Sequence, residues 1–290
     1  DEVLTNIEDR LWGKQVINAG YQIAYDPESP VYHHHGLHQG NKPERAKSIA
    51  SIIDDVDGEF VNELPKSLLP EFINVAAVLP VLGEVKTISD INLLEKSIEE
   101  LKQSKFLNNI YLLGEKKHVK RISQNLNVEF IDREKKLYDP DYGLENILKS
   151  SLIEIEDRGD FPDLVLYNNY LVPFRPPNLT DKLIKDAQFK GLDTVFPGYV
   201  DYANYWKLEN SGFIQIGDSV LPRSIKSPFY KALYGGSCLT LSSFIRKGLL
   251  IGDKVGIIPF ANFLYTLRVD DETPEKLIEL ALKEESFKNV

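Results

Sequence analysis

Methionine is absent from the 290 residues of this sequence, and cysteine occurs only once, as Cys238. A single cysteine cannot form an internal disulfide, so a reducing compartment is the default, and we predict a cytoplasmic protein. A natural chain of this length normally contains several methionines. We therefore expect the sequence to be an excised or renumbered portion of a longer protein.

Long apolar runs are absent as well. No stretch approaches the roughly 20 apolar residues that a membrane-spanning helix needs, and no signal peptide opens the chain. The formal net charge is −10, which argues against nucleic acid as a partner, because a phosphate backbone attracts basic surfaces. A small anionic substrate is compatible with this charge, since a divalent metal ion or a few local cations can hold one.

The composition is that of an ordinary globular domain, with 42% hydrophobic and 27% charged residues. After residue 73, short apolar runs alternate with helical patterns. Strands are predicted at 75–80, 109–114, 128–131, 163–167 and 194–196, and helices at 93–101, 118–125, 143–155 and 180–190. This alternation predicts an α/β domain with a doubly wound, mostly parallel sheet covered on both faces. Ligands bind such sheets at the carboxyl ends of the strands, where the strand order reverses.

The sequence before this domain has a different texture. Residues 1–40 are dense in aromatic side chains and histidine, whereas residues 41–72 are predicted to form a helix, at 43–53, followed by a connector. We therefore predict three parts, with the α/β domain covering residues 73–290.

The main motif follows the first predicted strand, in the segment Leu79–Asn92. This segment resembles the signature loop of the acylneuraminate (CMP-sialic acid) cytidylyltransferases, because matching residues occur at the right offsets. The matches are Pro80, Gly83, Lys86, Ile88 and Asn92. In that family the loop wraps the nucleoside triphosphate with backbone N–H groups and basic side chains. The resemblance therefore implies that Pro80, Gly83, Lys86 and Asn92 bind the nucleotide, in a domain of the nucleotide-diphospho-sugar transferase type.

The same loop also departs from the family. Leu82 replaces the expected arginine, Glu84 the second glycine, Val85 the serine, and Ile91 the lysine before the asparagine. Losing a cation and gaining a carboxylate removes about two units of favourable charge beside a triphosphate. The alternative is an unrelated strand, loop and helix, in which the proline and glycine are only turn formers.

A second group of matches follows in the family's order. In the segment Asn168–Arg175, Pro173 and Arg175 match, and Asn169 stands in for a glutamine. The resemblance implies that Asn169 contacts the nucleotide and that Lys86 and Arg175 serve catalysis. The alternatives are that Lys86 is a solvated loop lysine and that Arg175 pairs with a nearby carboxylate and fixes its own turn.

Near the end of the chain, Asp270 matches the second of the family's two metal-binding aspartates, and Asp271 directly after it could help, whereas Arg268 replaces the first aspartate. Hard cations prefer oxygen ligands, so the resemblance implies Mg²⁺ (or Mn²⁺) at Asp270 and Asp271. The alternative is that these acidic residues cap a helix that starts near Pro274.

Residues 1–40 resemble the end of an inverting GT-A glycosyltransferase domain. The Glu8-Asp9 pair would open a helix, and the histidines His33 and His35 would follow a short strand. The resemblance implies that Asp9 is a general base and that the histidines help to bind a metal. The nucleotide-binding half of that family would precede residue 1. For the histidines, a hydrogen-bonded turn is the alternative.

These resemblances predict a protein of surface-glycan biosynthesis, in which a glycosyltransferase is followed by a cytidylyltransferase-like domain. That domain would activate a sialic-acid-like, acidic sugar with CTP and release pyrophosphate. The alternatives are a noncatalytic domain for binding or assembly, a transferase with another nucleotide or acceptor, and a glycosyltransferase with an accessory C-terminal domain. The resemblance also implies a homodimer, with an interface in the tyrosine- and tryptophan-rich segment 194–223.

Overall fold

The structure is a computed structural model, and it describes residues 8–23, 73–132, 143–210, 212–217, 220–269 and 275–284. The chain divides into two compact units, Asp1–Ile73 and Asn74–Val290. In the first unit, helix α1 spans Glu8–Asn18. The helix predicted at 43–53 lies outside the described residues, and the three-part division of the chain stays a prediction.

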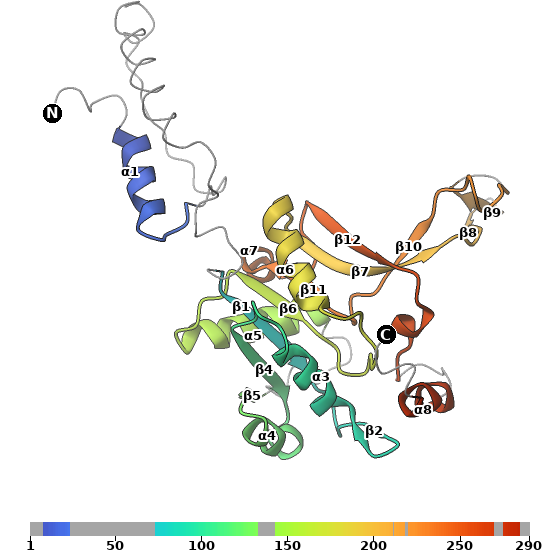
Figure 1. Ribbon diagram of the computed structural model, residues 1–290, viewed down its shortest axis with the longest axis horizontal. Helices are drawn as coiled ribbons and strands as arrows, with labels where there is room; N and C mark the ends of the chain where they lie inside the picture. The colour runs from blue at the N-terminus through green and yellow to red at the C-terminus, as the bar shows by residue number, and fades with distance from the viewer. Residues whose placement is uncertain are drawn as a thin grey trace, which may run out of the picture. The chain divides into compact units, whose positions relative to one another are not determined.

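The second unit is built on an eight-stranded sheet in the order β10-β7-β11-β6-β1-β4-β5, with β12 also paired to β7 (Figure 1). Its strands are β1 (Val75–Pro80), β4 (Asn109–Gly114), β5 (Glu129–Asp132), β6 (Leu164–Tyr167), β7 (Thr194–Asp201), β10 (Phe229–Ala232), β11 (Cys238–Leu241) and β12 (Val255–Phe260). Pairs β1–β4, β1–β6, β4–β5 and β7–β12 are parallel, whereas β11 runs antiparallel to β6 and β7, as does β10 to β7. The predicted α/β fold with a mostly parallel sheet is confirmed.

Strand β1 is central to the sheet because its side chains are apolar on both faces. Every residue from Val75 to Leu79 is fully buried, as expected for a parallel strand covered by helices on both sides. Leu79 pairs with Leu112 of β4, and Val78 pairs with Tyr167 of β6. The carboxyl ends of β4 and β6 therefore flank the end of β1.

Helices cover both faces of the sheet. The helices are α3 (Leu93–Lys102), α4 (Lys116–Asn125), α5 (Leu144–Asp157), α6 (Leu179–Lys190), α7 (Ser242–Lys247) and α8 (Glu275–Lys283), with a 3₁₀ helix at Phe263–Thr266. On one face, Leu148 and Leu152 of α5 and Ile245 of α7 pack with Ala76 and Val78 in one apolar cluster. Helices α3 and α6 cross the opposite face, where they lie in front of the strands in Figure 1. Among the described residues no helix is long and apolar enough to cross a membrane.

Two short hairpins were not anticipated from the sequence. Strands β2 (Thr87–Ile88) and β3 (Ile91–Asn92) pair across a turn in which Ser89 and Asp90 both have positive φ, at 49° and 65°. A turn of this kind usually carries Asn-Gly, so its sequence signal is weak here. The second hairpin consists of β8 (Tyr205–Glu209) and β9 (Gly212–Ile216), which form a separate two-stranded sheet.

A polar cluster fixes the amino-terminal edge of the sheet. The carboxylate of Asp160 accepts hydrogen bonds from Asn74 Nδ2 at 2.7 Å, Asn109 Nδ2 at 2.8 Å and the Tyr111 hydroxyl at 2.6 Å. Burial raises the pKa of Asp160, but these three hydrogen bonds outweigh burial, and the pKa lies below its ordinary value. The cluster thus connects β1, β4 and the loop before β6 through one ionised carboxyl.

We expect Asp160→Asn to destabilise the fold by about 1–3 kcal/mol at neutral pH, because an amide cannot accept all three hydrogen bonds. The pKa of Asp160 is lower in the folded state, so its contribution is complete above the unfolded value of about 3.9 and is lost as pH falls through the folded pKa. Urea unfolding should therefore show a difference that shrinks below about pH 4. Asp186→Asn, which removes an exposed pair with Lys190, is the control and should change stability little. A difference that is constant across this pH range would contradict the assignment.

Candidate functional site

Four chain segments meet at the carboxyl end of β1. Val81 N donates a hydrogen bond to Leu113 O of β4 at 2.7 Å, and Asn168 N, just after β6, donates to Val78 O at 3.1 Å. Asn169 N donates to Gly235 O, in the turn before β11, at 3.0 Å. The sheet continues in opposite directions from β1, through β4 and through β6, so this edge is where a ligand site is expected in a doubly wound fold.

The loop from Val81 to Lys86 is the open element of this edge. Val81 is buried, whereas Leu82 is 64% exposed and Glu84 and Lys86 also face solvent. Gly83 has φ of 68°, and a Cβ at this position would meet no atom within 4 Å. The loop backbone is therefore accessible, and glycine allows a conformation that other residues rarely adopt.

Asn92 lies at the far end of the predicted motif, where it caps helix α3. Its Oδ1 accepts hydrogen bonds from Leu94 N at 3.1 Å and Glu95 N at 3.2 Å, and its Nδ2 donates to Glu95 Oε1 at 3.1 Å. These bonds satisfy backbone donors that every helix leaves free in its first turn. The structure thus gives Asn92 a capping role, and its contact with a nucleotide stays a prediction.

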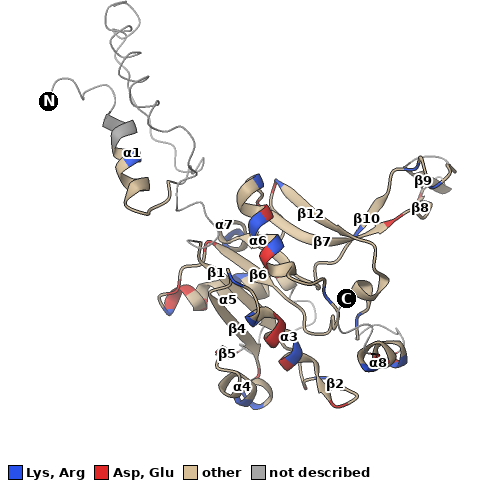
Figure 2. Ribbon diagram, in the orientation of Figure 1, with Lys and Arg blue, Asp and Glu red and all other residues tan. Residues whose placement is uncertain are grey.

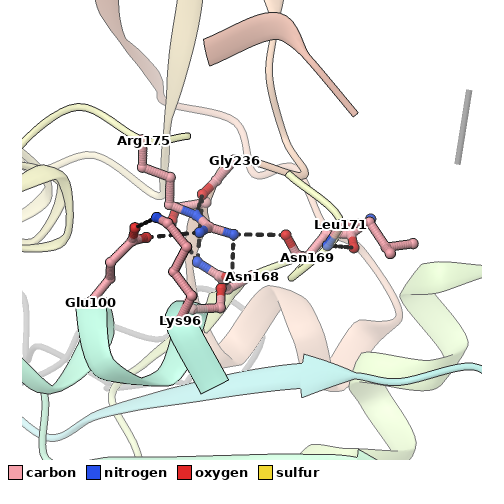
Figure 3. A network of polar contacts seen from close by, with 9 residues as sticks. Lys96, Glu100, Asn168, Asn169, Leu171, Arg175 and Gly236 are labelled. Atoms are coloured by element: carbon pink, nitrogen blue, oxygen red, sulfur yellow. Dashed lines mark hydrogen bonds and ion pairs between the residues drawn. The ribbon is translucent and has the colours of Figure 1, made fainter. Parts of the chain in front are cut away.

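Arg175 is the best-connected side chain near the edge (Figure 3). Its Nε donates to Gly236 O at 2.7 Å, and its Nη1 to Glu100 Oε2 at 3.0 Å. Nη2 donates both to Asn168 Oδ1 at 2.8 Å and to Asn169 O at 2.7 Å. The side chain is only 8% exposed. Burial lowers the pKa of Arg175 below its ordinary value, while the carboxylate of Glu100 acts in the opposite direction.

The network extends to side chains that sequence reasoning did not select. Asn168 is fully buried, accepts a hydrogen bond from Ser97 Oγ at 3.1 Å, and donates to Ser237 Oγ at 3.1 Å. Glu100 is held from its other side by Lys96. An asparagine directly after a buried strand was the available signal for Asn168. Glu100, by contrast, looks like any exposed helical glutamate in the sequence.

The predicted site residues therefore fall into separate groups. Pro80 is the last residue of β1, Gly83 and Lys86 belong to the open loop, and Asn169 and Arg175 belong to the loop after β6. These loops leave adjacent, paired strands. The contacts of Arg175 are those of the alternative interpretation, in which it pairs with a carboxylate and fixes the local turn.

The metal-binding predictions fall outside the described residues. These are Asp270, Asp271, His33 and His35, and the side chain of Asp9 in α1 is likewise not described. Within the described ranges, no three His, Cys, Asp or Glu side chains are placed to hold a metal ion. The metal site and the glycosyltransferase interpretation of residues 1–40 stay predictions.

Comparison with known proteins gives a likeness of structure alone. No protein-family model matches the chain, and no curated sequence does. A 4-diphosphocytidyl-2C-methyl-D-erythritol synthase from Anaerococcus prevotii has a TM-score of 0.53 and 11% identity, over 73% of this chain and 97% of that protein. A second such synthase has a TM-score of 0.55 and 11% identity, over 72% and 98% of the two chains.

A third similar structure is a CMP:2-keto-3-deoxy-manno-octonic acid synthetase complexed with CTP. Its TM-score is 0.52 and its identity 11%, over 72% of this chain and 98% of that protein. At such a low sequence identity, the structural likeness shows a shared fold and nothing further. The domain therefore shares the fold of these three proteins.

We expect Arg175→Ala to lower the free energy of unfolding by about 3 kcal/mol, because it breaks a partly buried ion pair and removes one hydrogen-bond donor each from Asn168, Glu100 and Gly236. Arg246, whose side chain is 46% exposed and pairs with Glu156, provides a matched control. Arg246→Ala should cost less than about 1 kcal/mol. If urea unfolding gave the same loss of unfolding free energy for both variants, the hydrogen bonds of Arg175 would not stabilise the fold as proposed.

Proposed function

We propose that Asn74–Val290 is a nucleotidyltransferase that binds CTP at the carboxyl edge of its sheet and transfers the cytidylyl group to an acidic, sialic-acid-like sugar. The observation that carries the proposal is the open loop Val81–Lys86, which follows the central parallel strand where the sheet changes direction. The structural neighbours support it, since their names specify diphosphocytidyl and CMP products and one is complexed with CTP.

In this reaction the main contributions of the protein are to align the two reactants and to offset the negative charge of the phosphates. A sugar hydroxyl would attack the α-phosphorus of CTP, and the bond to the pyrophosphate leaving group would break. Gly83 lets the loop backbone approach the phosphates, and Lys86 supplies a cation from the same loop. Further positive charge comes from α4, which begins just after the end of β4 and carries four Lys or Arg and no acidic residue (Figure 2).

In this proposal Arg175 is a positioning residue. The side chain donates four hydrogen bonds to protein acceptors, and two of them hold Asn168 and Asn169 at the end of β6. Its loss would therefore disturb the edge through the loop after β6, rather than by removing a contact with phosphate.

A second candidate function is noncatalytic binding by the same fold. It is favoured by Leu82, which exposes an apolar side chain in the loop where a cation is expected, and by Glu84, which adds a negative charge beside it. Two unit charges that lie about 4 Å apart near a protein surface interact with an energy of about 4 kcal/mol. The two departures are therefore large enough to weaken triphosphate binding severely.

Thermal unfolding with CTP and Mg²⁺ tests both candidates. A ligand that binds only the folded state raises Tm, and a concentration 100 times its Kd adds about 2.7 kcal/mol of stability. Lys86→Ala should reduce the Tm shift, because it removes the loop's cation. Leu82→Arg and Glu84→Gly should each increase it, the first by adding positive charge and the second by removing repulsion.

Pyrophosphate release with CTP and a sialic acid then separates catalysis from binding. Release that depends on Lys86 supports the transferase. If millimolar CTP and the other nucleoside triphosphates leave Tm unchanged while Leu82→Arg creates binding, the edge has lost its ligand and the noncatalytic candidate is correct. Lys102→Ala serves as the control, since Lys102 lies at the opposite end of α3 from the loop.

We also propose that the chain forms a homodimer through the β8–β9 hairpin. Leu208 pairs with Phe213 across the hairpin, and Trp206 lies on the same face. Their exposed fractions are 67%, 70% and 57%, an unusual density of large apolar side chains on a surface. The hairpin extends away from the main sheet in Figure 1, and two strands alone are marginally stable in water. A second copy of the hairpin would cover this face.

The molar mass in solution tests the dimer. Light scattering after size exclusion should give twice the chain mass for the wild type and a monomer for Leu208→Ser. Leu280→Ser changes a leucine of α8 that is 61% exposed, and it should leave the dimer intact. A monomeric wild type, or an equal effect of the two substitutions, would refute the hairpin interface.

A further inference from the structure

A cavity of about 510 Å³ opens between α3, the first turn of α6 and the last turn of α8. This volume lies within the range of about 300–1,000 Å³ found for small-molecule sites. Phe174, Leu101, Leu179 and Leu282 line it with apolar surface, and all four side chains are largely buried. Lys86 and the rest of the open loop do not line it, whereas Arg175 and Glu100 line it and also belong to the network at the carboxyl edge.

The charged groups of this cavity neutralise one another. Glu100 is held between Lys96 and Arg175, with Arg175 Nη1 at 3.0 Å from its Oε2. Asp181 accepts hydrogen bonds from the Ser104 hydroxyl and from Lys105 N, the latter at 3.0 Å. The lining thus contains two cations and two carboxylates, and each of the four makes a contact within the protein. A charged ligand would meet a group of its own sign and would find no net charge to offset its desolvation.

Uncharged polar side chains line the same cavity. Gln103 and Asn178 are exposed carboxamides, and Thr180 contributes a hydroxyl from the first turn of α6. Asn178 precedes α6 with φ of 56°, and its side chain does not cap that helix. These groups both donate and accept hydrogen bonds.

We propose that this cavity is a second binding site and that it takes a neutral saccharide. A sugar ring presents C–H groups that suit the Phe174 and leucine surfaces, and hydroxyls that suit the carboxamides and the remaining lone pairs of Glu100 and Asp181. The ligand differs from CTP and from an acidic sugar in having no charge. The inference therefore goes beyond the proposed function and does not depend on it.

Saturation-transfer NMR on the full chain tests the site with galactose, N-acetylglucosamine and lactose at millimolar concentration. We expect transfer from protein to at least one of these sugars. Asn178→Gly should weaken its binding about 2- to 10-fold, which is the effect of losing one neutral hydrogen bond. Glycine tolerates the positive φ of this residue, so the fold should be preserved.

Asn127→Gly is the matched control, because Asn127 also has positive φ, 50°, and follows α4 outside the cavity. It should leave sugar binding unchanged, whereas Gln103→Ala should weaken it. No transfer to any of the three sugars, or equal binding by the Asn178 and Asn127 variants, would overturn the proposal.

Competition separates this site from the nucleotide edge. Addition of CTP or of sialic acid should leave the sugar signal in place. If either one displaced the sugar, the cavity would not be a separate site for neutral ligands, and the proposal would be wrong. A chain that binds no CTP at all would still show the sugar signal, so failure of the proposed function and failure of this inference give different results.

Discussion

The buried guanidinium of Arg175 is the constraint on which the carboxyl edge of the sheet depends. Removing such a charge from water costs several kcal/mol, so it is tolerated only where acceptors surround it. Here the acceptors come from α3, the loop after β6 and the turn before β11, through Glu100, Asn168, Asn169 and Gly236. Each of these segments must keep its place for the others to be satisfied. The edge is therefore built as one unit around a cation that faces the protein.

This arrangement changes how positive charge is distributed near a ligand. Four of the five N–H donors of Arg175 are used by protein acceptors, which leaves one Nη1 N–H beyond these bonds. The charge available at the edge then comes from Lys86 and from the basic face of α4, both of which are solvated. Solvated cations attract anions more weakly and over a range limited by salt. In the proposed function, affinity for a triphosphate would thus depend mainly on the loop backbone.

The sequence predicted the fold where the signal was local. β1 and α3 were recognisable because a continuous apolar run and an apolar helical face depend only on neighbouring residues. β12 was missed because its exposed and half-buried residues alternate at the sheet edge and give no continuous run. The pairing of Arg175 with Glu100 joins residues 75 positions apart, and the sequence around either residue does not predict it. The motif located the loop after β6, but only the structure showed which way its arginine is directed.

The ion pair of Arg175 and Glu100 lies at the border between the two candidate sites, the cavity beside α3 and the carboxyl edge of the sheet. Nη1 of Arg175 meets Glu100 at the cavity, whereas Nε and Nη2 hold Gly236 and the asparagines at the edge. Arg175 and the hydrogen bond from Ser97 Oγ to Asn168 Oδ1 both link α3 to the edge, so any energetic coupling between the sites would pass through both.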